Sequence, residues 1–202
     1  MRRDKLLLAT GNRGKQREYK SLLRGISFDI VTPSERGINV AVDESGGSFE
    51  ENARLKAVAF ADASGLLALA DDSGLEVDAL GGEPGPLSAR YAGEGASDSD
   101  RISYLLSRLK DVPEKRRMAR FRCVIALAEP AGKVEIFSGE CRGVITTSPR
   151  GAHGFGYDPV FFLPELGKTM AELTVEEKNR ASHRARAAEK ARVFLMNLQL
   201  TS

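Results

Sequence analysis

Two adjacent carboxylates stand out because they follow a short apolar run. Asp71 and Asp72 come directly after residues 66–70, which read as a strand, and Ser73-Gly74 continue as a turn. Mg²⁺ is commonly bound by one or two carboxylates together with substrate phosphates. Successive strand residues face opposite sides, so we expect the two acids to differ in role. The alternative is an ordinary turn, in which Asp side chains accept hydrogen bonds from backbone N–H groups.

A second segment with chemical potential lies between the first expected strand and the first expected helix. It reads Thr10-Gly11-Asn12-Arg13-Gly14-Lys15. Glycines let a backbone approach a phosphate closely, helix N–H groups point at it, and Lys15 adds positive charge. The segment is not a Walker A loop, which has four residues between its glycines and a Ser or Thr after the Lys. A strand-to-helix turn that needs glycine explains the same residues equally well.

Two segments in the second half of the chain carry groups that could contact a nucleoside. Residues 154–159 read Gly-Phe-Gly-Tyr-Asp-Pro, so that Phe155 could present its ring to a flat ligand or anchor the loop in the core. Near the start of the last expected helix, Lys178, His183 and Arg184 offer several hydrogen-bond donors. The alternative for the second segment is a solvated helix face.

The elements that must position these residues alternate between strands and helices. Strands are expected at 5–10, 28–31, 66–70, 119–128 and 134–145, and helices at 15–23, 52–64, 98–110 and from 174 to about Gln199. Residues 48–51 and 174–177 have capping-box spacing at helix starts. Residues 81–95 and 150–156 are rich in glycine and are expected to be loops. The pattern predicts an α/β chain with a mixed sheet.

Composition places the chain among globular proteins. It has 202 residues, of which 42% are hydrophobic and 29% charged, with a formal net charge of +2. Two cysteines cannot build a disulfide framework, so a reducing compartment fits better. No apolar run approaches the roughly 20 residues of a membrane span, and no signal-peptide pattern opens the chain. We therefore expect a cytoplasmic protein without a membrane partner.

Charge is unevenly distributed along the chain. Residues 37–53 contain four acids, Glu44 among them, and no Lys or Arg, whereas the last expected helix is rich in bases. One interpretation is a set of solvated faces. The other is a cleft with an acidic metal site on one wall and anion contacts on the other, as a substrate that carries phosphate and Mg²⁺ requires.

Taken together, these segments resemble the inosine triphosphate pyrophosphatase family, also called Ham1-like. The matching segments are 9–15, 48–53 with Lys56, 70–74, 88–91, 155–159 and 182–184, in the family's order. The resemblance implies an α/β fold with a mixed twisted sheet and flanking helices. It further implies an elongated, two-lobed single domain over residues 1–202 with a central cleft, and a homodimer.

The resemblance also implies an activity: Mg²⁺-dependent hydrolysis of the purine nucleoside triphosphates ITP, dITP and XTP to the monophosphate and pyrophosphate, which removes them from the nucleotide pool. Asp72 would be the proton acceptor and, with Glu44, a metal ligand. The substrate would contact Thr10, Gly11, Asn12, Arg13, Gly14, Lys15, Ser73, Phe155, Gly156, Tyr157, Asp158, Lys178, His183 and Arg184. His153 stands where the family commonly has a small residue, at the rim of the base pocket.

Three other classes of protein fit these residues less well. A P-loop enzyme is disfavoured because Gln16 follows Lys15. A nucleic-acid-binding module would need a basic stripe with stacking aromatics, but aromatic residues make up 6% of the chain and Trp is absent. The Maf-like pyrophosphatases share the broad fold, but segments 155–158 and 182–184 favour the inosine-type family.

Overall fold

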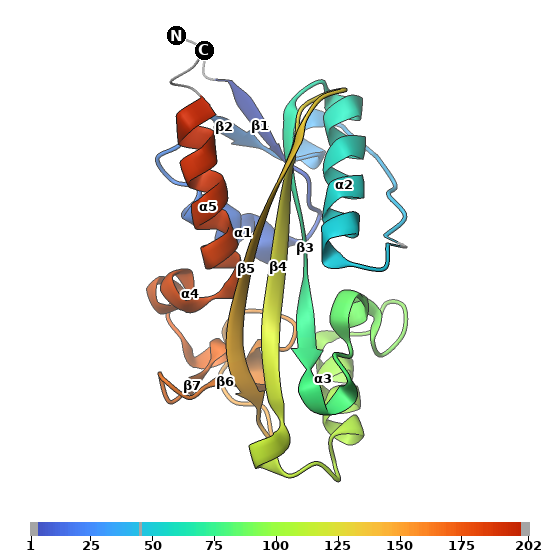
Figure 1. Ribbon diagram of the computed structural model, residues 1–202, viewed down its shortest axis with the longest axis vertical. Coiled ribbons are helices and arrows are strands. Elements are labelled where there is room, and N and C mark those ends of the chain that lie inside the picture. The colour runs from blue at the N-terminus through green and yellow to red at the C-terminus, as the bar shows by residue number, and fades with distance from the viewer. Residues whose placement is uncertain (1–3, 45, 199–202) are drawn as a thin grey trace. The chain divides into compact units, whose positions relative to one another are not determined.

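The structure is a computed structural model that describes residues 4–44 and 46–198 (Figure 1). Its strands are β1 Lys5–Leu8, β2 Asp29–Val31, β3 Leu67–Val77, β4 Met118–Ala128, β5 Val134–Ile145, β6 Phe161–Leu163 and β7 Lys168–Thr169. Its α-helices are α1 Arg13–Leu22, α2 Phe49–Ser64, α3 Asp98–Arg108, α4 Val175–Ala181 and α5 His183–Leu198. The strands form one sheet in the order β2-β1-β3-β4-β5-β6-β7.

The sheet is mixed, which confirms the predicted α/β class. β1 pairs in parallel with both β2 and β3, whereas β6 is antiparallel to β5 and β7. The chain divides into two compact units, each described here by itself. The first holds the residues up to Asp72, Cys123–Gly139 and the residues from Arg184 on; the second holds Ser73–Arg122 and Glu140–His183. The unit boundaries fall inside β3, β4 and β5 and after the first residue of α5.

Strand alternation gives the first unit two apolar layers. On β1, Leu6 and Leu8 join a cluster with Tyr19 of α1 and Ala188 of α5. The intervening Leu7 joins a cluster on the opposite face. There α2 presents fully buried alanines one helical turn apart, namely Ala53, Ala57 and Ala61. The sheet of this unit is therefore covered by α1 and α5 on one face and by α2 on the other (Figure 1).

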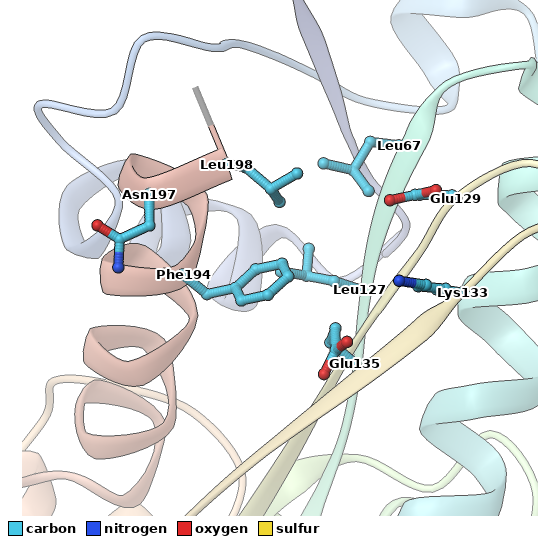
Figure 2. A pocket seen from close by; sticks show the side chains of 8 residues that line it. All are labelled: Leu67, Leu127, Glu129, Lys133, Glu135, Phe194, Asn197 and Leu198. Carbon is cyan, nitrogen blue, oxygen red and sulfur yellow. The ribbon is translucent and has the colours of Figure 1, made fainter. Parts of the chain in front are cut away.

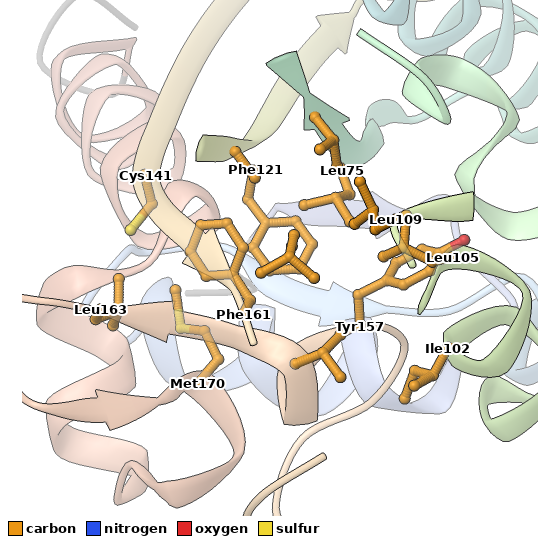
Figure 3. Close-up of a cluster of buried hydrophobic side chains, with 14 of the residues drawn as sticks. Leu75, Ile102, Leu105, Leu109, Phe121, Cys141, Tyr157, Phe161, Leu163 and Met170 are labelled. Carbon is orange, nitrogen blue, oxygen red and sulfur yellow. The ribbon is translucent and has the colours of Figure 1, made fainter. Parts of the chain in front are cut away.

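The second unit has its own core, built where α3 packs on the sheet. Leu105 of α3 and its C-cap residue Leu109 share one apolar cluster with Phe121 of β4 and Phe161 of β6 (Figure 3). The Phe121 and Phe161 rings lie 4.4 Å apart between centroids. Tyr157 is 4% exposed and belongs to this cluster, so one end of the predicted substrate loop is fixed in the core.

The predicted end of the third strand is wrong. β3 does not stop at residue 70 but continues through the two acids and Ser73-Gly74 to Val77. The continuation is stabilised by burial, because Leu75 and Val77 are fully inside the core of the second unit. The acids therefore lie within a strand rather than in a turn.

The single long helix predicted at the end of the chain is also wrong. α4 ends at Ala181 and α5 begins at His183, and Ser182 between them is extended, with φ −72° and ψ 154°. The predicted end at Gln199 lies outside the described residues. The first expected loop segment, 81–95, contains a 3-10 helix over Gly85–Arg90.

Both expected helix starts are confirmed by their capping hydrogen bonds. Ser48 Oγ accepts from the N–H of Glu51 at 3.1 Å, and Thr174 and Glu177 form a complete capping box. Within the described residues, no helix has the length and apolar character needed to cross a membrane.

Candidate functional site

The two adjacent acids of β3 meet different surroundings, as their opposite faces predict. Asp71 lies on the α1 and α5 side, with Cys123 Sγ 3.9 Å from its Oδ2. Asp72 lies on the α2 side, where its Oδ2 accepts a hydrogen bond from Asn52 Nδ2 at 3.0 Å. Both are buried, with exposed fractions of 2% and 6%. Strand geometry therefore assigns one carboxylate to each layer.

Asp71 is surrounded by charged side chains that we call the Asp71 cluster: Lys15, Glu18, Asp71 and Arg184. Lys15 Nζ lies 3.0 Å and Arg184 Nη2 3.5 Å from Asp71 Oδ2. Arg184 Nη1 donates to Glu18 Oε2 at 2.5 Å. Burial by itself would raise the pKa of Asp71, but the charges of Lys15 and Arg184 outweigh it and hold the pKa well below its ordinary value. Asp71 is therefore an ionised counter-charge and a poor base.

Asp72 has the opposite electrostatic setting. Burial raises the pKa of its carboxyl, against the lowering effects of the Asn52 hydrogen bond and of Lys56. Lys56 Nζ donates to the backbone oxygen of Asp71 at 3.1 Å and forms an ion pair with Glu44 Oε1, also at 3.1 Å. Asn52 and Lys56, one turn apart on α2, thus connect to β3 and to Glu44 from the same helix face.

The donor set around Asp72 suits Mg²⁺. The carboxylates of Asp72 and Glu44 are hard oxygen ligands. The Asn52 side-chain oxygen is buried beside them and makes no hydrogen bond to the described residues. Those residues contain no group of three or more His, Cys, Asp or Glu side chains able to hold a metal ion. A cation with two protein carboxylates needs further oxygen ligands, which substrate phosphates and water supply in typical Mg²⁺ sites.

The segment from Thr10 to Lys15 forms the start of α1, as expected for a phosphate-binding loop. Asn12 is the N-cap, and its Oδ1 accepts from the N–H of Lys15 at 3.1 Å. Gln16 Nε2 donates to the backbone oxygen of Thr10 at 2.8 Å, which ties the loop to the helix. Arg13 and Gly14 begin the helix, so their N–H groups have no intrahelical partner. Gly11, Asn12 and Arg13 are exposed, so they are accessible to a ligand.

In the second unit, a buried ion pair organises the Phe155 loop, which we define as residues 154–158. Asp158 Oδ2 accepts from Lys178 Nζ at 2.5 Å and from the N–H of Phe155 at 3.0 Å. Lys178 Nζ also lies 5.1 Å from the centre of the Phe155 ring. Gly154 has φ +83°, and a Cβ there would overlap the Asp158 carboxylate. The loop therefore brings together Phe155, Asp158 and Lys178.

The two remaining predicted donors have different partners. His183 is 4% exposed and stacks on Phe121 in the second unit, with ring centroids 4.7 Å apart and an interplanar angle of 18°. Arg184 is 2% exposed and belongs to the Asp71 cluster in the first unit. Both residues lie in the first turn of α5, where consecutive side chains point in directions about 100° apart, so they meet different neighbours. Their contact with a base stays a prediction.

The remaining predicted residues lie in a strand, in loops and in the core. Ser73 lies on β3 and is half-buried, Gly156 has φ +63°, and Tyr157 is part of the core. His153 is exposed, and its N–H donates to the backbone oxygen of Ala171 at 3.0 Å.

Two residues that the sequence did not identify as site residues are connected to the site in the structure. Glu18 pairs with Arg184, and Asn52 pairs with Asp72. Helical spacing was the available signal, since Glu18 follows Lys15 by three residues and Asn52 precedes Lys56 by four. The distant partners of these residues leave no such signal.

The first unit also contains a pocket of about 310 Å³ near the end of α5 (Figure 2). Its apolar lining comes from β3, β4 and α5, namely Leu67, Leu127, Phe194 and Leu198. Its polar lining consists of Asn197 on α5 and of charged residues in and near the β4–β5 turn, namely Glu129, Lys133 and Glu135. None of these is a predicted site residue, so this pocket adds nothing to the functional assignment.

Comparison with known proteins agrees with the fold and with the family that the sequence resembles. The chain matches the Ham1 family over residues 6–194. A dITP/XTP pyrophosphatase of Geobacter sulfurreducens is 54% identical over 183 residues, covering 91% of this chain and 92% of that protein. A solved structure of a Ham1 protein from Staphylococcus aureus has a TM-score of 0.86 and 42% identity, covering 96% of this chain and 99% of the other. A solved structure of a HAM1 protein from Coxiella burnetii has a TM-score of 0.88 and 41% identity, and it also covers 96% of this chain and 99% of the other.

The parallel pairing of β1 with β3, one carboxylate on each face of β3 and the exposed start of α1 define an α/β protein with a candidate site for a phosphate-bearing ligand. More particularly, the chain belongs to the Ham1 family.

Proposed function

We propose that this protein is a pyrophosphatase that hydrolyses dITP, XTP and ITP to the nucleoside monophosphate and pyrophosphate. The relatives that cover nine-tenths of the chain carry the name dITP/XTP pyrophosphatase. The structural observation that carries the proposal is that Asp71 and Asp72, on opposite faces of β3, have different partners. One carboxylate is neutralised among bases, and its neighbour stands beside Asn52 on the face of α2.

The residues of the first unit would bind the triphosphate and the metal. The start of α1 offers N–H groups and the positive end of a helix dipole to phosphate oxygens. Lys15 would exchange part of its interaction with Asp71 for a phosphate oxygen. Asp72 and Glu44 would hold Mg²⁺, which supplies charge neutralisation at the phosphates when bound. Lys56, which pairs with Glu44 in the structure, would release that carboxylate to the metal.

Asp72 is also the better candidate for the proton acceptor. Hydrolysis adds water across the bond between the α and β phosphoryl groups, and the attacking water must lose a proton. Burial raises the pKa of Asp72 in the protein alone, whereas Mg²⁺ held by the same carboxylate would lower it, so this role is supported by the position of Asp72 beside the proposed metal. Asp71 is disfavoured for this role, because its two bases stabilise the charged form. Asn52 would keep the Asp72 carboxylate oriented.

The residues of the second unit would bind the nucleoside. Phe155 would stack on the purine, with Lys178 and Asp158 holding the loop. Hypoxanthine and xanthine carry an acceptor oxygen at position 6, whereas adenine carries an amino donor there. Donors from Lys178 and His183 would therefore disfavour adenine, and Arg184, which belongs to the first unit, is proposed to add a further donor.

The proposal is tested by measuring pyrophosphate release from dITP, XTP, ITP, dATP, dGTP and a pyrimidine triphosphate. We expect the first three to be hydrolysed at least about 10²-fold more efficiently than dATP, and we expect a chelator of Mg²⁺ to stop the reaction. A preference for pyrimidines would support the Maf-like alternative. Transfer of the γ-phosphoryl group without pyrophosphate release would support a P-loop type of activity.

Two further proposals depend on the family resemblance. A homodimer would be measured by light scattering of the purified protein. A cytoplasmic location agrees with two free cysteines in place of a disulfide, and fractionation of cells would test it.

A further inference from the structure

The Phe155 loop has an anchor outside the residues assigned so far. Asp98, the first residue of α3, accepts a hydrogen bond from the N–H of Gly156 at 2.7 Å through its Oδ2. Its other carboxylate oxygen pairs with Arg101, three residues further along the helix. Arg101 in turn donates to the backbone oxygens of Ala89 at 3.0 Å and Ala96 at 2.6 Å. The carboxylate is therefore itself held in position.

The hydrogen bond to Asp98 acts on the peptide group that follows Phe155. The N–H of Gly156 belongs to that group, so its direction fixes how the backbone leaves the Cα that carries the aromatic ring. Gly156 has φ +63°, a conformation that glycine enters and leaves with little steric resistance. Sterics alone therefore do not fix this peptide plane, and hydrogen bonds restrain it instead. The N–H of Asp158 donates to the Phe155 oxygen of the same peptide at 3.3 Å, and the 2.7 Å hydrogen bond to Asp98 is the shorter of the two.

Packing does not replace this restraint. A pocket of about 370 Å³ is lined by Ile102 and Leu106 of α3 together with Ala152, His153 and Phe155. The Phe155 side of the loop thus borders a pocket rather than a filled core. Tyr157 differs, because its ring lies in the core of the second unit and its hydroxyl donates to the backbone oxygen of Ser88 at 2.9 Å (Figure 3).

We propose that Asp98 is a positioning residue of the base site, which keeps the Phe155–Gly156 peptide, and through it the Phe155 ring, in the orientation that receives the purine. The inference rests on the proposed function, because it takes Phe155 as a base contact. Asp98 acts through Gly156 and not on the reacting atoms.

The test compares two probes on the full-length protein by calorimetry: 2′-deoxyinosine monophosphate, which carries the base, and inorganic pyrophosphate with Mg²⁺, which does not. Asp98→Ala should weaken monophosphate binding by about tenfold, the loss expected for one hydrogen bond to a charged acceptor, and leave pyrophosphate binding unchanged. Asp98→Asn keeps an acceptor oxygen and should restore much of the affinity. Asp98→Glu keeps the charge at the helix start but displaces the oxygens, so it should behave like Asp98→Ala.

Asp100→Ala is the matched control. Asp100 is in the same helical turn and accepts from Ser97 in the capping box of α3. Its loss weakens the same helix start without touching the loop, so both affinities should stay as in the wild type. Asp98→Glu decides the question if Asp98→Ala does not fold.

Equal effects of Asp98→Ala and Asp100→Ala on monophosphate binding would overturn the inference, as would a parallel loss of monophosphate and pyrophosphate binding. Those results leave the proposed function intact. A wild-type protein that binds no deoxyinosine monophosphate would instead overturn the base site of the proposed function, and this inference with it.

Discussion

Asp71 and Asp72 differ only by the face of β3 on which they lie, and this decides what each can do. A carboxylate between two bases in a buried site is stabilised as an anion and resists protonation. Asp72 instead accepts a hydrogen bond from Asn52, and burial raises the pKa of its carboxyl. The first arrangement balances charge within the fold, and the second fits the proton transfer and metal binding that the proposed function assigns to Asp72.

Asp72→Asn should abolish most of the activity while leaving the fold intact. The amide oxygen of the new side chain can still accept from Asn52 Nδ2, so the local hydrogen bond survives. A metal ligand and a base are lost together, so we expect the turnover of dITP to fall by about 10²- to 10⁴-fold. Pyrophosphate release measures the rate, and thermal unfolding verifies the fold. Asp78→Asn, at an exposed acid just past β3, is the control. Turnover close to that of the control would contradict the role of Asp72.

Lys15→Ala should reduce both catalysis and stability. The side chain is 15% exposed and neutralises Asp71, and the proposed function also gives it a phosphate contact. Loss of a charge-assisted phosphate contact predicts a decrease in kcat/KM of about 10- to 150-fold. The unfolding free energy should fall by about 1–3 kcal/mol, because Asp71 keeps Arg184 as a partner.

Lys20→Ala is the matched control for this prediction. Lys20 lies on the same helix, is half exposed and pairs with Glu35 at 3.7 Å, so its removal should change neither quantity appreciably. A stability loss in Lys15→Ala with unchanged kcat/KM would assign Lys15 to the fold alone.

At the scale of elements, the Phe155 loop depends on a glycine that has no room for a side chain. Gly154→Ala would place a methyl group on the Asp158 carboxylate and disturb the hydrogen bonds from Lys178 and Phe155. We expect kcat/KM on dITP to fall by about 10²-fold, as a displacement of substrate contacts by about 1 Å can produce. Steady-state kinetics with dITP measures the loss.

Gly167→Ala separates backbone strain from displacement of the loop. Gly167 has φ +64°, in the same left-handed region, but a Cβ there would meet open space. Both variants should lose about 1 kcal/mol of stability from the unfavourable φ. Only Gly154→Ala should affect catalysis, and similar kinetics in the two variants would rule out the overlap with Asp158 as the cause.

Most elements were predictable because their signals are local. Ser48 and Thr174 indicate helix starts because each has a glutamate three positions later. The predicted bounds of the hairpin strands β4 and β5 agree with the structure to within one residue. β3 was cut short because Asp-Asp-Ser-Gly has turn chemistry, whereas burial of Leu75 and Val77 in another core extends the strand. The break at Ser182 escaped detection because no Gly or Pro marks it.

The site was predictable to the extent that its residues form motifs. The Asp72 and Phe155 segments were found, but ion pairs between residues 166 positions apart, such as Glu18 with Arg184, have no local signature. Asp98 was missed for the same reason, since its partner Gly156 lies 58 positions away. Such contacts follow from the sheet order, which sequence periodicity does not specify.

At the scale of the whole molecule, both thiols are enclosed and should be chemically silent. Cys123 and Cys141 are 0% and 3% exposed, and they belong to different cores. Burial, with the nearby Asp71 charge, raises the pKa of the Cys123 thiol to about 12, so it carries almost no thiolate at neutral pH.

We therefore expect neither thiol of the native protein to react with Ellman's reagent at a rate approaching that of the unfolded chain. Protection of at least about 10³-fold is expected where exposure requires unfolding. In guanidinium chloride the two cysteines should both react. A native protein that releases one equivalent of chromophore rapidly would contradict the buried position of that cysteine.

Laboratory evolution toward heat resistance alone would act on the Asp71 cluster in a specific way. Replacing a complete set of buried charges by apolar residues of similar volume often preserves or increases stability, by about 1–4 kcal/mol, whereas removing one charge leaves its partner stranded. Lys15, Glu18, Asp71 and Arg184 would therefore be difficult to change singly and easy to change as a set. A variant in which all four residues were replaced would tolerate heat better but would lose turnover. Selection that preserves the cluster would therefore act through substrate binding and not through stability of the fold.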